Sequence, residues 1–339
     1  MTKIAINGFG RIGRLLFRQL VAEKGVAVVA INDLASPENL VYLLKYDSVY
    51  GRFSGSVELK DGVLVVEGKE IAILQEKDPS KLPWAKLGVD VVVEATGAFT
   101  SYSQAKAHIE QAGAKRVVIT APSKEEDSAE GKTVLMGVNE EALSTCLVSS
   151  NGSCTTNAAG PLMQILSENP GILKAQLSSV HGYTASQSLV DGPSKKDPRR
   201  GRAGAYNIVP SSTGAAVAVS RALPELKGKF DGLAFRVPVI AGSVADITFV
   251  AKRKTSREEV NDILKKAAEN PRWKGVFTVT EEPIVSSDII REPFGAIADL
   301  SFTKVVDGDL VKVLSWYDNE WGYVATLRQH VLAAAKTIK

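Results

Sequence analysis

The chain has 339 residues, of which 45% are hydrophobic and 23% charged, and its formal net charge is +3. This is the composition of a globular protein long enough for two domains, and so small a net charge does not indicate a nucleic-acid-binding protein. No apolar run reaches the roughly 18 residues of a membrane-spanning helix, and the opening MTKIAINGFG lacks the pattern of a signal peptide.

The first segment predicts a strand, a glycine-rich turn and a helix. KIAI is a β-type run, Gly8, Gly10 and Gly13 follow it as GxGxxG, and a helical pattern continues to Gly25. VAVVAIND then predicts a second strand, which ends at Asp33, twenty residues after Gly13. This arrangement is typical of a dinucleotide-binding fold.

Each of these residues has a physical role in that interpretation. The glycines allow the tight turn, the approach of a pyrophosphate and close packing of helix on strand, and the helix N-terminus attracts the anion. Asp33 can accept hydrogen bonds from the ribose hydroxyls and would repel a 2′-phosphate, so we predict NAD as cofactor. The alternative is that the glycines only make a turn and that Asp33 caps the next helix, which begins at Ser36 and Pro37.

The alternation of strands and helices continues. VELKDGVLVV predicts a hairpin around Asp61 and Gly62, VDVVVEATG and AKRVVIT predict buried strands, SYSQAKAHIEQAG predicts a helix ending at Gly113, and CLVSSNGS predicts a last strand. We therefore expect a Rossmann-type, doubly wound parallel sheet. Thr96 and Gly97 follow a strand's carboxyl end, where such sheets bind ligands.

The second half has a different pattern. ILKAQLSSVHGYT, GLAFRVPVI, SVADITFVAKR, AIADLSF and LVKVLSWYD predict long strands with few helices between them, which indicates an α+β domain with a mixed or antiparallel sheet. SREEVNDILKKAAEN and the terminal segment predict helices. The polar loop 185–206 has the length of a functional or interface loop. We expect a nucleotide-binding domain over 1–153, a catalytic domain over 154–319, and a terminal helix, 320–339, that packs on the first domain.

Cys154 stands at the start of a predicted helix in SSNGSCTTNAAGPL. A thiol there could be a core residue, a metal ligand, half of a disulfide or a nucleophile. The scattered histidines and cysteines do not favour a metal site, and the absence of CxxC favours a reducing cytosol. A helix N-terminus stabilises a thiolate. We interpret Cys146, within an apolar run, as a core residue.

Several motifs together resemble one known family, the phosphorylating glyceraldehyde-3-phosphate dehydrogenases. The resemblance covers essentially the whole chain and rests on INGFGRIGR at the start, SCTTN at 153–157, HGYTASQ at 181–187, DGPS at 191–194, RRGRA at 199–203, NIVPSSTGAA at 207–216, PELKGK, AFRVP at 234–238 and WYDNEWGY at 316–323. It implies oxidation of D-glyceraldehyde 3-phosphate to 1,3-bisphosphoglycerate with NAD and inorganic phosphate, in a cytoplasmic homotetramer of glycolysis, with neither membrane nor nucleic acid as a partner.

The resemblance also implies the roles of particular residues. Cys154 would be the nucleophile that forms a hemithioacetal and a thioester, and His181, 27 residues later, its base; as an imidazolium His181 would lower the thiol pKa. Cofactor contacts would come from Gly8, Gly10, Arg11, Ile12, Gly13, Asp33, Thr96, Gly97, Thr120, Asn319 and Tyr323. Thr184, Arg200 and Arg236 would hold the substrate phosphate, and Ser153, Thr155, Thr213 and Gly214 the inorganic phosphate, with Arg236 near both. No metal is expected.

Arg236 has independent support, because a guanidinium within the apolar run LAFRVP needs an anion. Some positions depart from the family pattern: Gly152 stands where alanine is common and Ala158 where many members have a second cysteine, and residues 125–132 look like a lengthened surface loop. Leu34 and the pair Gly192–Pro193 resemble the NAD-using members. The alternatives are an erythrose 4-phosphate dehydrogenase, a water-using dehydrogenase, and a non-catalytic binding protein with the same fold.

Overall fold

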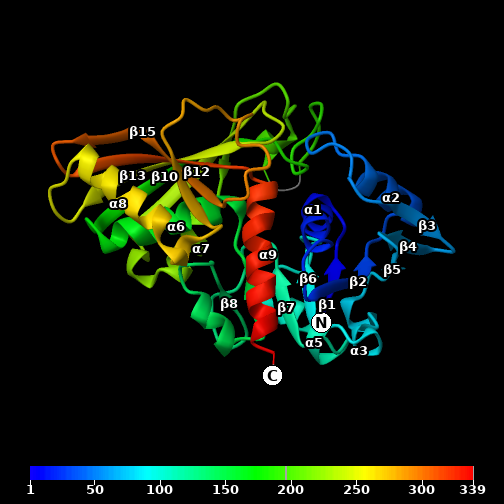
Figure 1. Ribbon diagram of the computed structural model, residues 1–339. Helices are drawn as coiled ribbons and strands as arrows, with labels where there is room; N and C mark the ends of the chain where they lie inside the picture. The colour runs from blue at the N-terminus through cyan, green and yellow to red at the C-terminus, as the bar shows by residue number, and fades with distance from the viewer. Residues whose placement is uncertain (195–196, 339) are drawn as a thin grey trace. The chain divides into compact units, whose positions relative to one another are not determined.

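The computed structural model describes residues 1–194 and 197–338, so Lys195 and Lys196 of the loop 185–206 and the last residue of the expected segment 320–339 lie outside the description. It divides into two compact units (Figure 1). Unit 1 contains Met1–Val134, Glu140–Gly152 and Leu327–Lys339, and unit 2 contains Leu135–Asn139 and Ser153–Thr326. In the described part of the chain, no helix combines the length and hydropathy required to span a membrane.

Unit 1 is built on a nine-stranded sheet in the order β3-β4-β5-β2-β1-β6-β7-β9-β8. Its strands are β1 (Thr2–Asn7), β2 (Val26–Asn32), β3 (Val57–Lys60), β4 (Val63–Val66), β5 (Lys69–Leu74), β6 (Val91–Glu94), β7 (Arg116–Ile119), β8 (Lys132–Thr133) and β9 (Val148–Ser150). Every pairing is parallel except the hairpins β3–β4 and β4–β5. The predicted Rossmann-type parallel sheet is confirmed.

The central strands of unit 1 form where the sequence is apolar on both faces. All four residues of β6 and all four of β7 are buried, as expected for a sheet covered on both sides. The helices of unit 1 are α1 (Arg11–Leu20), α2 (Pro37–Lys45), α3 (Trp84–Leu87), α4 (Tyr102–Ala105) and α5 (Ala107–Glu110), together with the end of α9 (Trp321–Lys336). The Ser36 hydroxyl caps α2 as predicted, accepting from the Asn39 N–H.

Two helix predictions in unit 1 are wrong in detail. The first helix ends at Leu20 rather than near Gly25, because residues 21–25 form turns that lead into β2. The single helix predicted before Gly113 is two short helices, α4 and α5, separated at Lys106. Cys146 is buried, as expected, but it precedes β9 instead of lying inside a strand.

Unit 2 contains a seven-stranded mixed sheet in the order β11-β12-β10-β13-β16-β15-β14. Its strands are β10 (Ile172–Gly182), β11 (Val209–Ser212), β12 (Phe230–Val237), β13 (Ser243–Ala251), β14 (Phe277–Thr280), β15 (Ala296–Val306) and β16 (Leu310–Tyr317). The pairs β10–β12 and β14–β15 are parallel and the others antiparallel. The predicted mixed sheet is confirmed, although the short strands β11 and β14 were not predicted.

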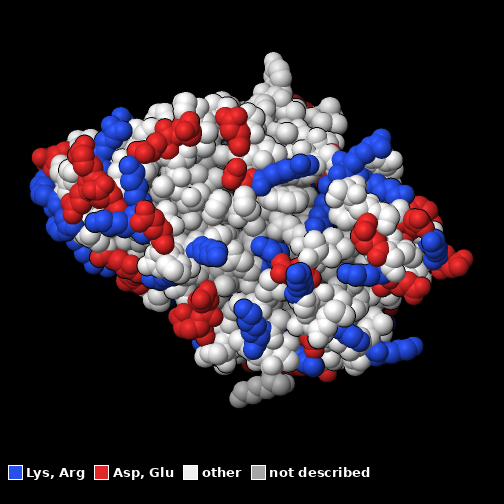
Figure 2. Space-filling model, viewed as in Figure 1, with Lys and Arg blue, Asp and Glu red and all other residues white. Residues whose placement is uncertain are grey.

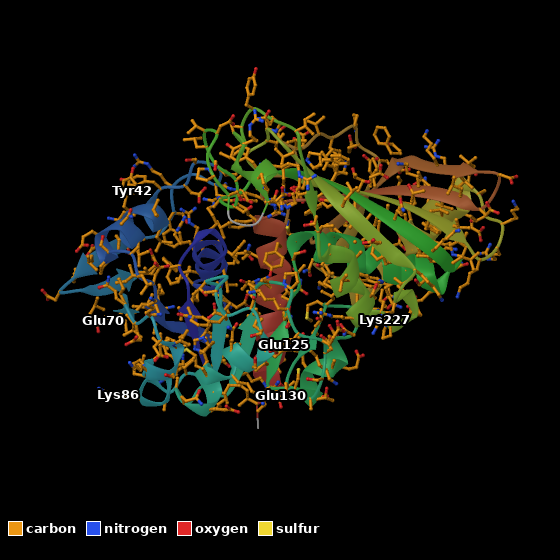
Figure 3. The ribbon with its side chains drawn as sticks, turned by 180° about the vertical axis from the view of Figure 1, so that it is seen from behind. Tyr42, Glu70, Lys86, Glu125, Glu130 and Lys227 are labelled. Carbon is orange, nitrogen blue, oxygen red and sulfur yellow. The ribbon has the colours of Figure 1, made fainter. Side chains whose placement is uncertain are left out.

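The described part of unit 2 also contains the helices α6 (Cys154–Glu168), α7 (Ala215–Ala222) and α8 (Arg257–Glu269), and the first residues of α9. The α6 helix contacts β15 and β16, and eleven of its fifteen residues are buried, so its first residues are held firmly on the sheet. Lysine and arginine side chains are interspersed with acidic ones on the visible face (Figure 2), as the small net charge suggests. Exposed side chains such as Tyr42, Lys86 and Lys227 point away from the ribbon (Figure 3).

Candidate functional site

A pocket of about 900 Å³ opens in unit 1 at the carboxyl ends of the parallel strands. It is lined by Asn7, Gly8, Gly10, Asn32, Asp33, Leu34, Glu76, Lys77, Asp78, Pro79, Lys81, Ala95, Thr96, Ala98 and Phe99. Four of these residues, Gly8, Gly10, Asp33 and Thr96, are among the cofactor contacts predicted from the sequence. This is the edge at which open parallel sheets bind nucleotides.

Two of the three glycines of the GxGxxG motif, Gly8 and Gly13, occupy positions where a side chain does not fit. Gly8 has φ +95°, and a Cβ on it would lie 2.5 Å from the Thr96 nitrogen. A Cβ on Gly13 would lie 2.1 Å from the Gly8 carbonyl oxygen. Gly10, the N-cap of α1, has no side-chain cap and has open space beside it. The turn therefore fits a pyrophosphate at the helix N-terminus.

Asp33 has a fixed carboxylate at the end of β2. Its Oδ2 accepts from the Phe9 N–H at 2.7 Å and its Oδ1 from the Ala35 N–H at 3.0 Å. Each carboxylate oxygen has further acceptor capacity, so Asp33 can receive the ribose hydroxyls of NAD while facing into the pocket.

Other predicted cofactor residues do not line this pocket. The Arg11 guanidinium pairs with Asp47 and lies 5.6 Å from the centroid of the Tyr50 ring. Ile12, Gly13, Gly97 and Thr120 are also absent from the lining. Sequence reasoning missed the lining segment 76–81, because it follows β5, a strand that was not predicted. Asn7 and Asn32, which end β1 and β2, also line the pocket and were not predicted. Their position at the carboxyl end of a strand is the signal that predicted Thr96, and it applies to them equally.

Cys154 is the first residue of α6 in unit 2. Ser153 caps this helix: its Oγ accepts from the Thr156 N–H at 3.1 Å, and the Ser153 N–H donates to the Thr156 hydroxyl at 3.1 Å. This capping box fixes the first turn. The Cys154 Sγ lies 3.3 Å from His181 Nε2, which is close enough for the thiol to donate to the imidazole.

The register of the sheet brings His181 and Arg236 together. The two residues are direct partners in the parallel pair β10–β12. His181 is buried, and its Nδ1 lies 2.6 Å from the Gly182 carbonyl oxygen and also 2.6 Å from Arg236 Nη1. The carbonyl requires a proton on Nδ1, whereas the guanidinium requires a lone pair there. A neutral imidazole can satisfy only one of these neighbours.

Burial dominates the protonation of this pair. Burial, together with the positive charges of Arg236 and Arg200, lowers the pKa of His181 to about 3. Burial raises the pKa of the Cys154 thiol, while Arg236, the Thr155 hydroxyl and backbone N–H groups at the helix start oppose that rise. Both effects disfavour the imidazolium that the sequence predicted, and they make Arg236 the cation that favours the thiolate of Cys154.

The predicted phosphate-binding residues of unit 2 include two arginines that repel each other. Burial lowers the pKa of Arg236, and the charge of Arg200 lowers it further. Arg236 Nε is buried without a hydrogen-bond partner among the described residues, and the Arg200 guanidinium donates a long 3.3 Å bond to the Ser212 carbonyl. A bound anion would satisfy both guanidinium groups.

The hydroxyls expected at the phosphate sites already have partners within unit 2. The Thr184 and Ser186 hydroxyls are 2.9 Å apart, the Thr213 hydroxyl accepts from the Ala215 N–H at 3.2 Å, and Gly214 is the N-cap of α7. The Thr155 hydroxyl lies 2.9 Å from the Tyr317 hydroxyl. These groups are oriented before any ligand binds.

Tyr317 is a site residue that sequence reasoning missed. Its hydroxyl joins those of Thr155 and Ser179, at 2.9 and 2.8 Å, and its ring meets His181 edge-on with centroids 6.0 Å apart. Burial raises its pKa. The motif WYDNEWGY predicts Asn319 and Tyr323 as site residues but contains no separate signal for Tyr317.

Asn319 and Tyr323 lie in unit 2. The Asn319 Oδ1 accepts from the Gly242 N–H at 3.0 Å and from the Ser243 hydroxyl at 2.9 Å, which fixes the orientation of its amide. Tyr323 is buried near the start of α9.

A Rossmann-type nucleotide pocket in unit 1 and a cysteine–histidine pair in unit 2 are features of the NAD-dependent dehydrogenases. Comparison with known proteins agrees. Residues 2–102 match the NAD-binding domain of glyceraldehyde 3-phosphate dehydrogenase, and residues 153–319 match its C-terminal domain. The chain belongs to the glyceraldehyde-3-phosphate dehydrogenase family.

Several bacterial proteins named glyceraldehyde-3-phosphate dehydrogenase are similar to this chain. The glyceraldehyde-3-phosphate dehydrogenase of Borreliella burgdorferi is 49% identical over 95% of this chain and 96% of its own length. That of Clostridium pasteurianum is 47% identical over the whole of both chains, and that of Streptomyces coelicolor 46% identical over 95% of each. These similarities extend across both units.

Proposed function

We propose that this chain oxidises D-glyceraldehyde 3-phosphate to 1,3-bisphosphoglycerate, with NAD as oxidant and inorganic phosphate as the second substrate. The observation that carries the proposal is the arrangement of Cys154 Sγ 3.3 Å from His181 Nε2, with Arg236 on the other imidazole nitrogen. The neutral imidazole and the helix-capped thiol are the groups that such a reaction needs.

The reaction proceeds through covalent attachment to the cysteine. Cys154 Sγ adds to the aldehyde carbon while its proton passes through His181 Nε2 to the carbonyl oxygen, which gives a hemithioacetal. His181 Nε2 then accepts the hydroxyl proton as the carbon is oxidised to a thioester. NAD, when bound, supplies the acceptor for the hydride. A phosphate oxygen next attacks the thioester carbon, the Cys154 sulfur leaves, and the acyl phosphate is released.

The arginines serve both anions in this scheme. Arg200, Arg236 and Thr184 hold the phosphate of the substrate, and Ser153, Thr155, Thr213 and Gly214 hold the attacking phosphate, with Arg236 near both. An anion on Arg236 would also draw its guanidinium away from His181 Nδ1. That nitrogen could then donate to the Gly182 carbonyl, and Nε2 would keep the lone pair that a base requires.

NAD would be held by Gly8, Gly10, Asp33 and Thr96, whose pocket fits a dinucleotide, and by Arg11, Ile12, Gly13, Gly97 and Thr120 near it. The fixed amide of Asn319 and the ring of Tyr323 would serve the nicotinamide. The cofactor domain would extend over 1–153 with the terminal helix 320–339, and the catalytic domain over 154–319.

A cytoplasmic homotetramer that acts in glycolysis is part of the same proposal. The loop 185–206 supports it, because Leu189, Val190 and Tyr206 are 82%, 73% and 86% exposed, and apolar side chains gathered on one loop suit burial against a neighbouring subunit. Sedimentation would test this assembly.

The test of the function is NADH formation at 340 nm with D-glyceraldehyde 3-phosphate, with and without inorganic phosphate, for the parent chain and for Cys154→Ser. We expect phosphate-dependent activity that the substitution abolishes. Activity without phosphate would instead indicate a water-using enzyme, and preference for erythrose 4-phosphate would indicate that relative. A parent chain inactive with both aldehydes would overturn the proposal. Cys146→Ser is the matched control and should remain active.

A further inference from the structure

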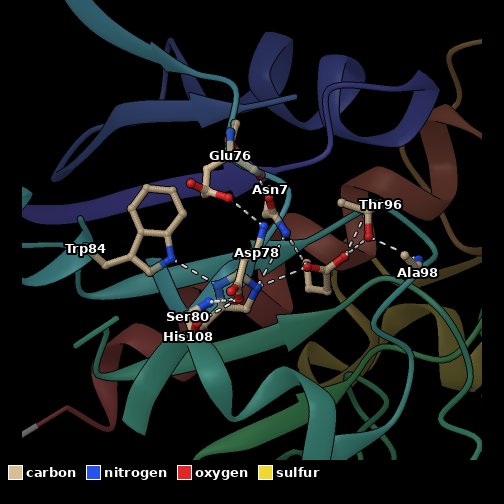
Figure 4. Close-up of polar contacts among 10 residues, drawn as sticks. Asn7, Glu76, Asp78, Ser80, Trp84, Thr96, Ala98 and His108 are labelled. Carbon is tan, nitrogen blue, oxygen red and sulfur yellow. Dashed lines mark hydrogen bonds and ion pairs between the residues drawn. The ribbon is translucent and has the colours of Figure 1, made fainter. Parts of the chain in front are cut away.

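A row of buried polar side chains crosses the carboxyl ends of four neighbouring strands in unit 1. The strands stand in the order β5-β2-β1-β6. Asn32 ends β2, Asn7 ends β1 and Glu94 ends β6, and none of the three is more than 4% exposed. We call these residues, with Glu76, Thr96, His108 and Trp84, the Glu94 ladder (Figure 4). The proposed chemistry does not use its buried charge.

The amides of the ladder connect the strand ends in series. The Asn32 side chain accepts from the Glu76 N–H and donates to the Glu76 carbonyl, both at 2.8 Å, and it also donates to Asn7 Oδ1 at 2.7 Å. Asn7 Nδ2 in turn donates to Glu94 Oε2 at 2.5 Å. Since an amide has distinct donor and acceptor ends, each orientation depends on the next residue, and the series ends at the carboxylate.

Glu94 is surrounded by donors. Its Oε2 also accepts from His108 Nε2 at 3.1 Å, and its Oε1 accepts from the Thr96 N–H at 2.9 Å and from the Thr96 hydroxyl. The Trp84 indole donates to His108 Nδ1 at 3.0 Å, so the proton of the neutral imidazole is on Nε2. Four donors on two oxygens call for an ionised carboxylate, because a proton on either oxygen would face a donor.

The ladder has one side in the nucleotide pocket and one side in the core. Asn7, Asn32, Glu76 and Thr96 line the pocket, whereas Trp84 and His108 are fully buried behind it. Neighbouring parallel strands lose their backbone pairing where they end, and the ladder supplies side-chain bonds at that point. The shape of the pocket wall therefore depends on a charge that does not itself line the pocket.

We propose that Glu94 is a positioning residue for NAD: its buried carboxylate, oriented by His108, fixes Asn7 and the backbone at Thr96 so that the pocket wall matches the dinucleotide. The inference rests on the proposed assignment of this pocket to the cofactor. A positioning role differs from a role in folding alone, because the loss of the Glu94 carboxylate should then reduce NAD affinity in a protein that remains folded.

Glu94→Gln is the first test, because it removes the charge and keeps the shape. Wherever the new amide nitrogen lies, it faces at least one N–H donor that cannot turn to accept, and leaving such groups unsatisfied should raise the KM and the dissociation constant for NAD roughly 10- to 100-fold. The kcat at saturating NAD should stay within about threefold, because the ladder touches no reacting atom. Titration calorimetry and steady-state kinetics give both quantities.

Glu125→Gln is the matched control. Glu125 accepts from the N–H of Ser103 on Oε2 at 3.0 Å and from its hydroxyl on Oε1 at 2.5 Å, so, like Glu94, it binds both donors of one hydroxyl-bearing residue. It does not line the pocket and is labelled in Figure 3. We expect its NAD affinity to equal that of the parent chain.

A swap of the two polar groups gives a rescue. Asn7→Asp alone places two carboxylates side by side and should weaken NAD binding at least as much as Glu94→Gln. In the double variant Asn7→Asp/Glu94→Gln, the carboxylate at position 7 can accept from the amide at position 94. It can also accept from His108 Nε2, which lies 3.4 Å from Asn7 Nδ2 in the parent chain. We expect NAD affinity to return to within about threefold of the parent.

Normal NAD affinity in folded Glu94→Gln would overturn the proposal, as would a fall in melting temperature with unchanged affinity. Should Glu94→Gln fail to fold, Thr96→Val tests the same idea at the exposed end of the ladder. This substitution removes one donor to Glu94 and should raise the KM for NAD about 2- to 10-fold. An unchanged KM for NAD would overturn the proposal. A parent chain that does not bind NAD would instead remove the pocket assignment itself.

Discussion

The nucleotide pocket of unit 1 and the cysteine–histidine site of unit 2 arrange their buried polar groups in opposite ways. In the Glu94 ladder of unit 1 each donor meets an acceptor: the Asn32 amide donates to Asn7, and the Asn7 amide donates to the Glu94 carboxylate. In unit 2, two neighbours compete for His181 Nδ1, and Arg236 Nε has no partner among the described residues. The first arrangement suits a binding wall that is complete without its ligand. The second suits a reactive site that an anionic substrate completes.

Two histidines make the contrast specific. Burial lowers the pKa of both His330, in unit 1, and His181, in unit 2, to about 3. His330 is matched on both nitrogens: Nε2 accepts from the Ser149 hydroxyl at 2.7 Å and Nδ1 donates to Asn151 Oδ1 at 3.0 Å. Burial is therefore common to both residues, and their partners distinguish them: His330 is matched on both nitrogens, whereas two neighbours compete for His181 Nδ1.

The largest expected effect is the difference in kcat between two variants that carry the same substitution, one at each histidine. His181→Gln should lower kcat roughly 10²- to 10⁴-fold, because general base catalysis contributes about that much. Steady-state NADH formation at saturating substrates measures it. His330→Gln should leave kcat close to that of the parent chain. Equal losses in the two variants would show that both act through structure, and the comparison would fail.

Much of the contrast in fold was predictable from the sequence. The apolar runs of β6 and β7 and the glycines of the first turn predicted a parallel sheet with a nucleotide edge, and the longer strands of the second half predicted a mixed sheet. The segment 76–81 was missed because β5 has the sequence KEIAIL, in which the first two residues are charged and exposed, so the strand has no clear apolar period.

The site was predictable only in part. The motif around Cys154 and the spacing to His181 identified the pair, but the contact of His181 with Arg236 depends on the register of β10 and β12, which a single sequence does not specify. The ladder was missed for a similar reason. Asn7 and Asn32 each read as ordinary strand-end residues, and their pairing arises only when β1 and β2 lie side by side.

A smaller effect on the kinetics is expected from replacing Arg236, the buried cation of unit 2 whose Nε has no hydrogen-bond partner among the described residues. Arg236→Leu should raise the KM for phosphate and lower kcat/KM roughly 10- to 100-fold, since hydrogen bonds to charged groups contribute about 1.5–3 kcal/mol. The melting temperature should not fall, because the substitution removes an unsatisfied buried donor. Kinetics and thermal unfolding check both parts. A clear fall in melting temperature would show instead that other groups of the protein already satisfy the Arg236 guanidinium.

Arg199→Leu is the control for the Arg236 variant. Arg199 is exposed and pairs with Asp197, so its removal should leave the KM for phosphate unchanged. A similar rise in both variants would indicate a general effect of positive charge on phosphate capture rather than a site at Arg236.

The smallest expected effect concerns acid stability, where the two histidines should act alike. A buried neutral histidine with a pKa of about 3 binds no proton between pH 3 and 6.5, while the unfolded chain does. Stability from each is full above pH 6.5 and falls by up to about 1.4 kcal/mol per unit as the pH decreases below it. His330→Gln and His181→Gln should each flatten this slope in urea unfolding between pH 5 and 7. Flattening by only one of them would mean that the other is already protonated in the folded protein, and for His181 that would restore the imidazolium that burial otherwise excludes.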